Sequence, residues 1–258
     1  MTNWPITHNS GVTEATNLSG STSVNSIGTS WTQLIAATTA DYHGFFLIPS
    51  QASAGTANVA IDIGIGASGQ EFALITDLLF PNGSRTLGYS AFIPIFIPAG
   101  SRVVARCTAS TPLQLFGCMQ GWPGMPLFSI AEETTENQGT AGTTINTGAS
   151  LNTDIAYVQM LASTTKHWKA IMVEIAQATS SQTADALIDI AIGAGGSEQE
   201  LLSDLSVSTE AISDVTWPMI FGPFPCDIPI GTRIAARGRS STTNSSGRVF
   251  EVKVHGFA

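Results

Sequence analysis

One phrase occurs twice in the sequence, and this repetition constrains the fold more than any other feature. Residues 60–78 read AIDIGIGASGQEFALITDL, and residues 186–205 read ALIDIAIGAGGSEQELLSDL. Several charged residues recur at matching places in the two copies. The matching pairs are Asp62 with Asp189, Glu71 with Glu198, and Asp77 with Asp204. The chain therefore folds the same unit twice.

The repeat extends well beyond this phrase. Residues 33–39 match residues 159–165 at an offset of 126, and the phrase itself matches at 127. Residues 97–106 then match residues 228–237 at 131, and Gly121-Trp122 matches Gly256-Phe257 at 135. An offset that grows in small steps is typical of loop insertions between fixed elements. A long period that occurs only twice indicates a duplicated domain and not a solenoid.

Each copy reads as a series of strands. Ile61, Ile63 and Ile65 alternate with Asp62 and Gly64, which is the period-two pattern of a half-buried strand. Further short β-rich runs are separated by turns about every ten residues, a spacing typical of a β-sandwich or jelly roll. We expect an all-β chain of two tandem, duplicated, antiparallel β-sandwich domains, jelly-roll-like in kind. Two acidic segments, 71–79 and 198–205, remain helix candidates.

Composition changes along the chain mark its organisation. Residues 1–21 read as an extended N-terminal arm and residues 22–123 as the first sandwich. Residues 124–144 contain turn residues and a small acidic run, which is linker chemistry, and residues 145–258 form the second sandwich.

The first copy contains Gly64-x-Gly66-x-x-Gly69, which raises the question of a dinucleotide-binding loop. That fingerprint needs a strand, a glycine turn, a long helix and an acidic residue about 20 positions on. The segment after Gly69 is short, and the second copy has Ala191 in place of the first glycine. We interpret the glycines as a tight strand connection and expect no cofactor.

Charge and cysteine content exclude several classes of function. The net charge is −9, from 10 basic and 19 acidic residues, so the mean field repels nucleic acid and anionic lipid. No apolar run approaches the roughly 18 residues of a membrane span. The N-terminus has no pattern of a secretory signal, and the odd cysteine count indicates no disulfide framework. We expect a chain made in a reducing cytoplasm.

No catalytic constellation stands out, and we expect the protein not to be an enzyme. The sequence contains no G-x-S-x-G or H-E-x-x-H motif, and no residue spacing is typical of a metal site. The histidines share no aligned position, and all four are expected on the solvated surface. The cysteines are expected to be small core hydrophobes.

The retained charges are the candidate site residues, with a structural role favoured. We expect carboxylate–guanidinium pairs that fix strand register. The alternative is a polar groove for a glycan or a neighbouring subunit, with aromatic residues as a possible sugar platform. The candidate charge-pair residues are Asp62, Arg102, Arg106, Asp189, Arg233 and Arg237. The aromatic residues at matching positions are Trp31 with Tyr157 and Tyr42 with Trp168.

The phrase at residues 61–78, followed by FIPAGSRVVAR at 96–106, resembles a β-rich module of tailed-bacteriophage virion proteins. The resemblance recurs at 188–205 and 228–237, and it includes neither the arm nor the linker. It implies a non-enzymatic structural role on the virion, and it brings no catalytic residues.

Three functions follow as expectations. The first is a capsid decoration or cement protein that binds the major capsid protein or another virion protein and stabilises the particle. It would form a homo-oligomer, with a trimer favoured, in which Trp4 and Ile6 of the arm contact a neighbouring chain. The second is a tail-fibre or receptor-binding, glycan-binding component. A β-sandwich glycoside hydrolase is a distant third, because the sequence places no suitable carboxylate pair.

Overall fold

The structure is a computed structural model of the 258-residue chain, and it contains two all-β modules. It describes residues 16–17, 29–51, 59–80, 91–107, 113–120, 128–129, 131–133, 142–177, 184–209, 219–241 and 248–258. The first module contains β1 (Thr16–Asn17), β2 (Thr32–Ile35), β3 (Gly44–Gln51), β4 (Val59–Ile65), β5 (Phe72–Phe80), β6 (Ala91–Ile93), β7 (Val103–Cys107) and β8 (Leu113–Gln120). The second contains β10 (Thr143–Asn146), β11 (Val158–Leu161), β12 (Trp168–Gln177), β13 (Ala184–Ile192), β14 (Gln199–Thr209), β15 (Met219–Ile228), β16 (Ile234–Ser240) and β17 (Val249–Phe257). One short strand, β9 (Ala131–Glu133), lies between them.

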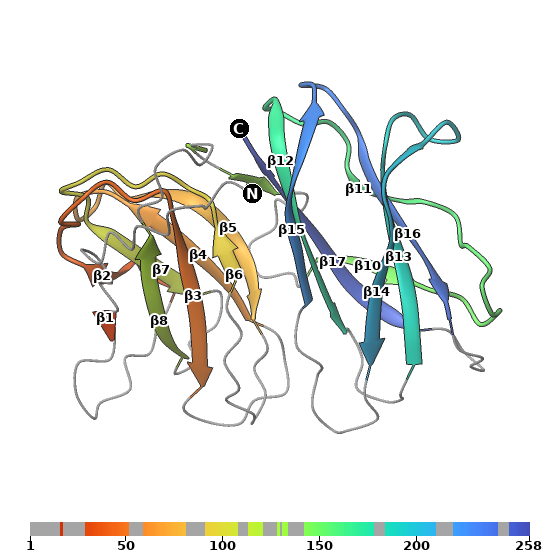
Figure 1. Cartoon of the computed structure of the whole chain (residues 1–258), viewed down its shortest axis with the longest axis horizontal. Coiled ribbons are helices and arrows are strands. Elements are labelled where there is room, and N and C mark those ends of the chain that lie inside the picture. Colours follow the sequence, from red (N-terminus) through yellow and green to blue (C-terminus); the bar gives the residue numbers. More distant parts are fainter. Residues whose placement is uncertain are drawn as a thin grey trace, which may run out of the picture.

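Both modules have the same strand order. In the first, a β3 sheet with the order β1-β8-β3-β6 faces a β4 sheet with the order β2-β7-β4-β5. In the second, a β12 sheet with the order β10-β17-β12-β15 faces a β13 sheet with the order β11-β16-β13-β14. Among the eight described strands of each module, the first pairs with the eighth, the second with the seventh, the third with the sixth and the fourth with the fifth. This is a long hairpin rolled into two sheets, the jelly-roll arrangement (Figure 1).

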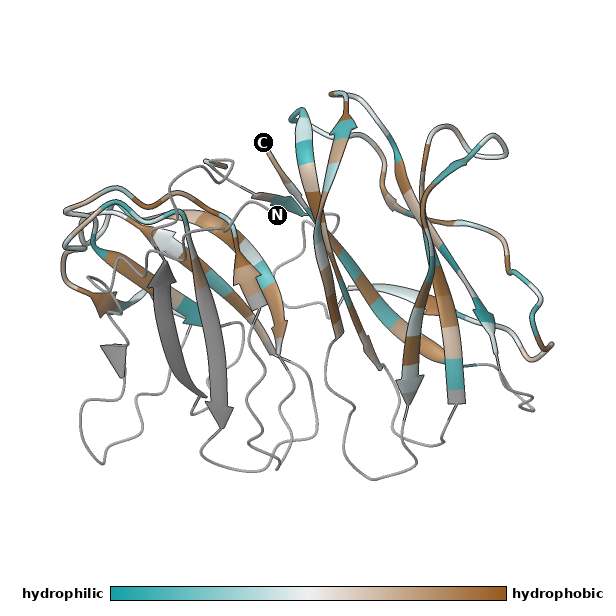
Figure 2. Ribbon diagram, viewed as in Figure 1, coloured by the Kyte–Doolittle hydropathy of each residue, from teal (hydrophilic) through white to brown (hydrophobic). Residues whose placement is uncertain are grey.

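The cores follow from the period-two pattern of the strands. In β12, Ile171, Val173 and Ile175 are buried in the core of the second module, together with residues of β13, β16 and β17. In the first module, Ile61 and Ile63 are buried beside residues of β7. Brown and teal segments alternate along the strands in Figure 2, as expected when one face of each sheet is buried. The predicted all-β sandwich fold is confirmed.

The two acidic helix candidates are strands. Segments 71–79 and 198–205 form most of β5 and β14, each hydrogen-bonded to the preceding strand of its module. Their apolar residues serve the sandwich core, since Ile75 and Leu205 are buried. No described segment is a helix, so the structure shows no helix that could cross a membrane in the part of the chain that it describes.

The modules meet where the β12 sheet covers the edge of the β4 sheet. The strand β5 is at that edge, beside the second module in Figure 1. From the second module, Ala170, Met172 and Phe257 join the core cluster of the first. The outer face of the β12 sheet is therefore interior, which explains why polar residues on it are buried.

Part of the expected linker, residues 124–144, has regular structure that connects both modules. Phe128 forms a parallel bridge with Ile95 of the first module and packs against Phe257, with ring centroids 5.6 Å apart. The strand β9 then pairs with β17 of the second module. Low hydrophobicity predicted a connector here, but the backbone of residues 131–133 can pair with β17 whatever its side chains are.

Candidate functional site

In each module an aspartate, Asp62 or Asp189, lies opposite a β-bulge in the next strand. In β5, Thr76 and Asp77 both lie opposite Asp62 of β4, because the register shifts between Ile61 and Ile63. The bulge leaves the N–H of Asp77 without a ladder partner, and it donates to Asp62 Oδ1 at 2.8 Å. The second module repeats this bond, from the N–H of Asp204 to Asp189 Oδ1, also at 2.8 Å. Each carboxylate is therefore held by the backbone of the next strand.

The second oxygen of each aspartate binds an arginine on the other neighbouring strand. Arg106 Nε lies 2.5 Å from Asp62 Oδ2, and Arg237 Nε lies 2.9 Å from Asp189 Oδ2. Each arginine is directly opposite its aspartate in the strand register. These bonds tie three adjacent strands together at one level, and a one-residue slip would break them.

An aromatic ring covers each of these guanidinium groups. The Cζ atom of Arg106 lies 4.5 Å from the ring centroid of Trp31, and that of Arg237 lies 4.7 Å from the centroid of Tyr157. Burial raises the pKa of the Tyr157 hydroxyl to about 12, so this residue stays neutral at physiological pH. One face of each ring is occupied by a cation and is not open to a sugar.

A second arginine in each module closes the glycine turn. Arg102 Nη1 donates to Gly66 O at 3.0 Å and pairs with Glu71 at 2.8 Å, while its Nε donates to Gln33 at 2.9 Å. The other oxygen of Glu71 accepts the N–H of Gly69 at 2.8 Å. The structure therefore pairs Arg102 with Glu71 and not with Asp62. The turn uses its own carboxylate where a phosphate-binding loop would hold an anion.

The second module repeats every bond of this turn. Arg233 binds Gly193 O at 3.1 Å, Glu198 at 3.0 Å and Gln159 at 3.1 Å. The hydrogen bond from Arg102 is the largest cause that lowers the pKa of Glu71. The pKa of Glu198 is also lowered, first by the hydrogen bond from its own backbone N–H and then by Arg233. Both carboxyls are therefore anionic partners at neutral pH.

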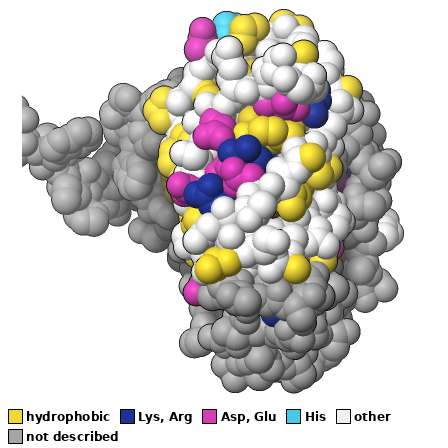
Figure 3. All heavy atoms as spheres, turned by 90° about the vertical axis from the view of Figure 1, so that its right-hand side faces the viewer, with side chains coloured by type: hydrophobic (Ala, Val, Ile, Leu, Met, Phe, Trp, Pro, Cys, Tyr) yellow, Lys and Arg dark blue, Asp and Glu magenta, His cyan; other side chains and the backbone are white. Residues whose placement is uncertain are grey.

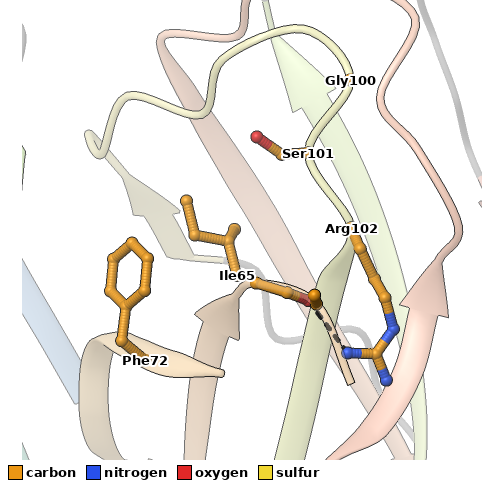
Figure 4. A pocket seen from close by; sticks show the side chains of 7 residues that line it. Ile65, Phe72, Gly100, Ser101 and Arg102 are labelled. Carbon is orange, nitrogen blue, oxygen red and sulfur yellow. Dashed lines mark hydrogen bonds between the residues drawn. The ribbon is translucent and has the colours of Figure 1, made fainter. Parts of the chain in front are cut away.

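A shallow pocket of about 320 Å³ lies beside this turn in the first module (Figure 4). Ile65, Phe72 and Arg102 line it, and Phe72 is 53% exposed. The close-up shows the Arg102 side chain turned toward the backbone of the turn, where its hydrogen bond is drawn. The second module has Gln199 at the position of Phe72, so the apolar wall is specific to the first copy.

The outer face of the β13 sheet extends the charge pairs into a larger network. Arg237 also contacts Asp154 and Glu200, and Arg239 pairs with Asp154 and Asp204. Figure 3 looks onto this side of the molecule and shows the acidic and basic side chains gathered together. Arg233, Arg237 and Arg239, which stand close together in the sequence, are therefore all paired with acidic residues of their own module.

All six candidate charge residues lie in these two repeated clusters, whereas Trp4 and Ile6 lie outside the described residues. Sequence reasoning did not name the partners of Arg102 and Arg233. These partners are Glu71 with Gln33, and Glu198 with Gln159, and each residue stands in a segment that matches between the copies. That shared occurrence was the signal that could have found them.

The prediction for the histidines is wrong for His255. This side chain is fully buried, and its Nε2 lies 3.1 Å from Glu174 Oε2. The burial comes from the junction between the modules, which single-chain patterns do not show. His167 is exposed and pairs with Asp227, as expected for a surface residue. Cys107 is buried in the core as predicted, and Cys226 is half-buried.

Two other observations bear on binding. Tyr42 and Trp168 are fully buried, so neither contributes to an exposed aromatic surface. Within the described ranges, no group of three histidine, cysteine, aspartate or glutamate side chains could hold a metal ion.

Comparison with known proteins gives no family. No protein-family model matches the chain, and no curated protein matches its sequence. A fucolectin from striped bass (Morone saxatilis) serum is 12% identical, with a TM-score of 0.26, over 88% of this chain and 85% of that one. A chain of the T13 viral particle of infectious bursal disease virus (IBDV) is 11% identical, with a TM-score of 0.23, over 86% of this chain. The Gx strain of that virus gives 10% identity and a TM-score of 0.25 over 87% of this chain.

This chain covers 56% and 58% of the two virus chains. Because the identities and TM-scores are low, the structural similarity to these virus chains and to the lectin is weak.

Proposed function

We propose that this protein is a non-enzymatic structural protein of a tailed-bacteriophage virion, a decoration protein that binds the outer surface of the capsid and stabilises the particle. One observation carries the proposal. The polar side chains retained in both copies are engaged in holding strands and turns, as in the bonds of Asp62 with Arg106 and Asp77. Because both modules spend their shared polar side chains on holding the fold, we interpret each module as a rigid unit whose surface binds other proteins.

The sequence resemblance supplies the setting for such a unit. The segments that resemble tailed-phage virion modules, 61–78 with 96–106 and 188–205 with 228–237, contain the aspartate, glutamate and arginine residues of the repeated clusters. Jelly rolls occur in viral capsid and lectin domains, and this support from the fold is analogy only. We propose the major capsid protein or another virion protein as partner, and a homo-oligomer, with a trimer favoured, as the attached form.

The glycan-binding alternative has less support from the site. Sugar platforms need exposed aromatic faces. Trp31 and Tyr157 each have one face against a guanidinium, and Tyr42 and Trp168 are buried.

The test is reconstitution on particles that lack the protein. Purified full-length chain is added to undecorated particles, which are then imaged by electron cryomicroscopy and heated to measure loss of the genome. We expect symmetric density on the outer capsid and a higher temperature of genome release. Density at the tail alone, or no attachment together with binding to a glycan array, would contradict the proposal.

Deletion of residues 1–20 tests whether the arm with Trp4 and Ile6 anchors the protein to the particle. Unchanged occupancy of the particles by the shortened chain would show that the arm has no anchoring role.

A further inference from the structure

A cluster of titratable side chains is buried between the two modules. Asp77 of β5, Glu174 of β12, and Lys253 and His255 of β17 are all 1% exposed or less. Glu133 of β9 joins them, half-buried. Asp62, which is paired with Arg106, lies next to Asp77. Charged groups are rarely buried unless they are paired, so this junction is chemically unusual.

Two of these side chains satisfy the open edge of β5. The N–H of Leu79 donates to Glu174 Oε2 at 2.9 Å, and Lys253 Nζ donates to Asp77 O at 2.9 Å. An edge strand presents backbone groups that need partners. Here the partners are side chains of the other module, so the hydrogen bond of the Leu79 N–H exists only while the modules are docked.

Glu133 lies opposite His255 in the β9–β17 ladder, and β9 packs against β5, which brings the Glu133 carboxyl near that of Asp77. Both oxygens of Asp77 and the Oε2 of Glu133 are buried without a hydrogen-bond donor among the described residues. Two ionised carboxylates cannot donate to one another, whereas a proton on one of them makes an O–H···O bond. With that proton, the pair carries a single negative charge.

We propose that the docking of the two modules is controlled by a proton shared between Asp77 and Glu133, so that rising pH loosens the junction while each sandwich stays folded. The device does not depend on the virion role proposed above. The groups that face the pair are Asp62 from β4, Glu174 from β12, and Lys253 and His255 from β17. Loss of the proton leaves two adjacent carboxylates in a buried site.

The direction of the pH effect follows from the raised pKa values. Burial first and neighbouring Asp77 second raise the pKa of Glu133 to about 8. Burial also raises the pKa of Asp77. In separated modules both groups would titrate near about 4. Docking therefore takes up a proton between about pH 4 and 8. It is strongest at the acidic end and weakens about tenfold per pH unit until about pH 8.

Amide hydrogen exchange of the full-length chain tests this proposal. The Leu79 N–H reports on docking, and the N–H of Ile190 in the second core reports on whether the sandwich stays folded. After correction for intrinsic exchange, we expect the protection of Leu79 to fall about a hundredfold between pH 5.5 and 7.5, while Ile190 stays more protected than Leu79 at every pH. Glu133→Gln, which keeps a neutral side chain at every pH, should remove this dependence. Glu200→Gln, on the exposed face of the β13 sheet, should retain it.

Constant protection of Leu79 in the wild-type chain would overturn the proposal, as would an unchanged slope in the Glu133→Gln variant. If that variant fails to fold, carboxyl ¹³C NMR of the wild-type protein decides the question. A carboxyl of Asp77 or Glu133 that titrates above pH 7 supports the shared proton. Titration of both of these carboxyls below pH 7 rejects it.

Discussion

Asp77 and Asp204 have the same backbone conformation at equivalent positions, with φ values of 51° and 58°, but only one of them is buried. Asp77 is 1% exposed, while the side chain of Asp204 is 54% exposed and pairs with Arg239. Both donate their N–H to the aspartate of the preceding strand. The bulge therefore belongs to the fold of both modules, whereas the burial of the aspartate side chain belongs only to the junction in which Asp77 lies.

The aspartate that accepts the bulge N–H should be important for stability in either module. Asp62→Ala and Asp189→Ala each remove two hydrogen bonds and leave the N–H of the bulge without its acceptor. Arg106 also loses its carboxylate partner, whereas Arg237 keeps Asp154 and Glu200. We expect each to lower the free energy of unfolding by about 2–4 kcal/mol. Urea denaturation measures this. Asp227→Ala is the control, because that side chain is 74% exposed and should cost less than about 0.5 kcal/mol. A loss below about 1 kcal/mol at Asp62 would argue against its structural role.

The glycines of the first turn should rank by backbone geometry. Gly66 has a φ of 135°, and an added Cβ would lie 2.5 Å from Gln70 O, whereas a Cβ at Gly69 would meet nothing within 4 Å. We expect Gly66→Ala to cost about 3 kcal/mol and Gly69→Ala about 1–2 kcal/mol, because Gly69 also has a positive φ. Thermal unfolding of both variants checks the order. Equal losses would mean that close contact at Gly66 is not what requires glycine there.

The repeated parts of this fold could be predicted from the sequence, and the junction could not. Asp62 and Asp189, with Arg106 and Arg237, stand at matching positions, so a shared structural role was visible in the sequence. Their partner on the third strand is a backbone N–H that a bulge sets free. A bulge has no side-chain signal in a single sequence unless glycine marks it, and here the bulged residue is an aspartate.

Apart from Asp77, the buried cluster at the junction between the modules is marked neither by residues that match between the copies nor by a glycine. Glu174, Lys253 and His255 read as the polar, solvent-facing positions of strands, which they would be in an isolated sandwich. Burial comes from the docking of β5 against them, a contact between segments about 100 or more residues apart. The same tertiary contact explains why the surface prediction for His255 was wrong.

The bulge in β14 should tolerate only residues that accept a positive φ. Asp204→Val forces a β-branched residue into the left-handed region, and we expect a loss of about 2 kcal/mol. Asp204→Asn should cost less than about 1 kcal/mol, because asparagine accepts this conformation and only the exposed pair with Arg239 is weakened. Ser206→Val on the same strand is the matched control, and it should change stability by no more than about 0.5 kcal/mol. If valine is tolerated equally at both positions, the backbone at 204 does not need a special residue.

The last prediction concerns the lysine buried at the junction. Lys253→Met keeps nearly the same volume but removes the donor to Asp77 O. It also removes a fully buried positive charge beside Asp77 and Glu133. Breaking a buried charge cluster on one side leaves the other charges uncompensated, so we expect a loss of about 3–5 kcal/mol in urea denaturation. Lys169→Met is the control, since Lys169 is 52% exposed in its pair with Asp227 and should cost less than about 0.5 kcal/mol. Lys253 also lowers the pKa of both Asp77 and Glu133, so without it their ionised forms become less favourable still. The loss should therefore be larger at pH 8 than at pH 6, and a loss that is equal at both pH values would mean that Lys253 contributes packing and not charge.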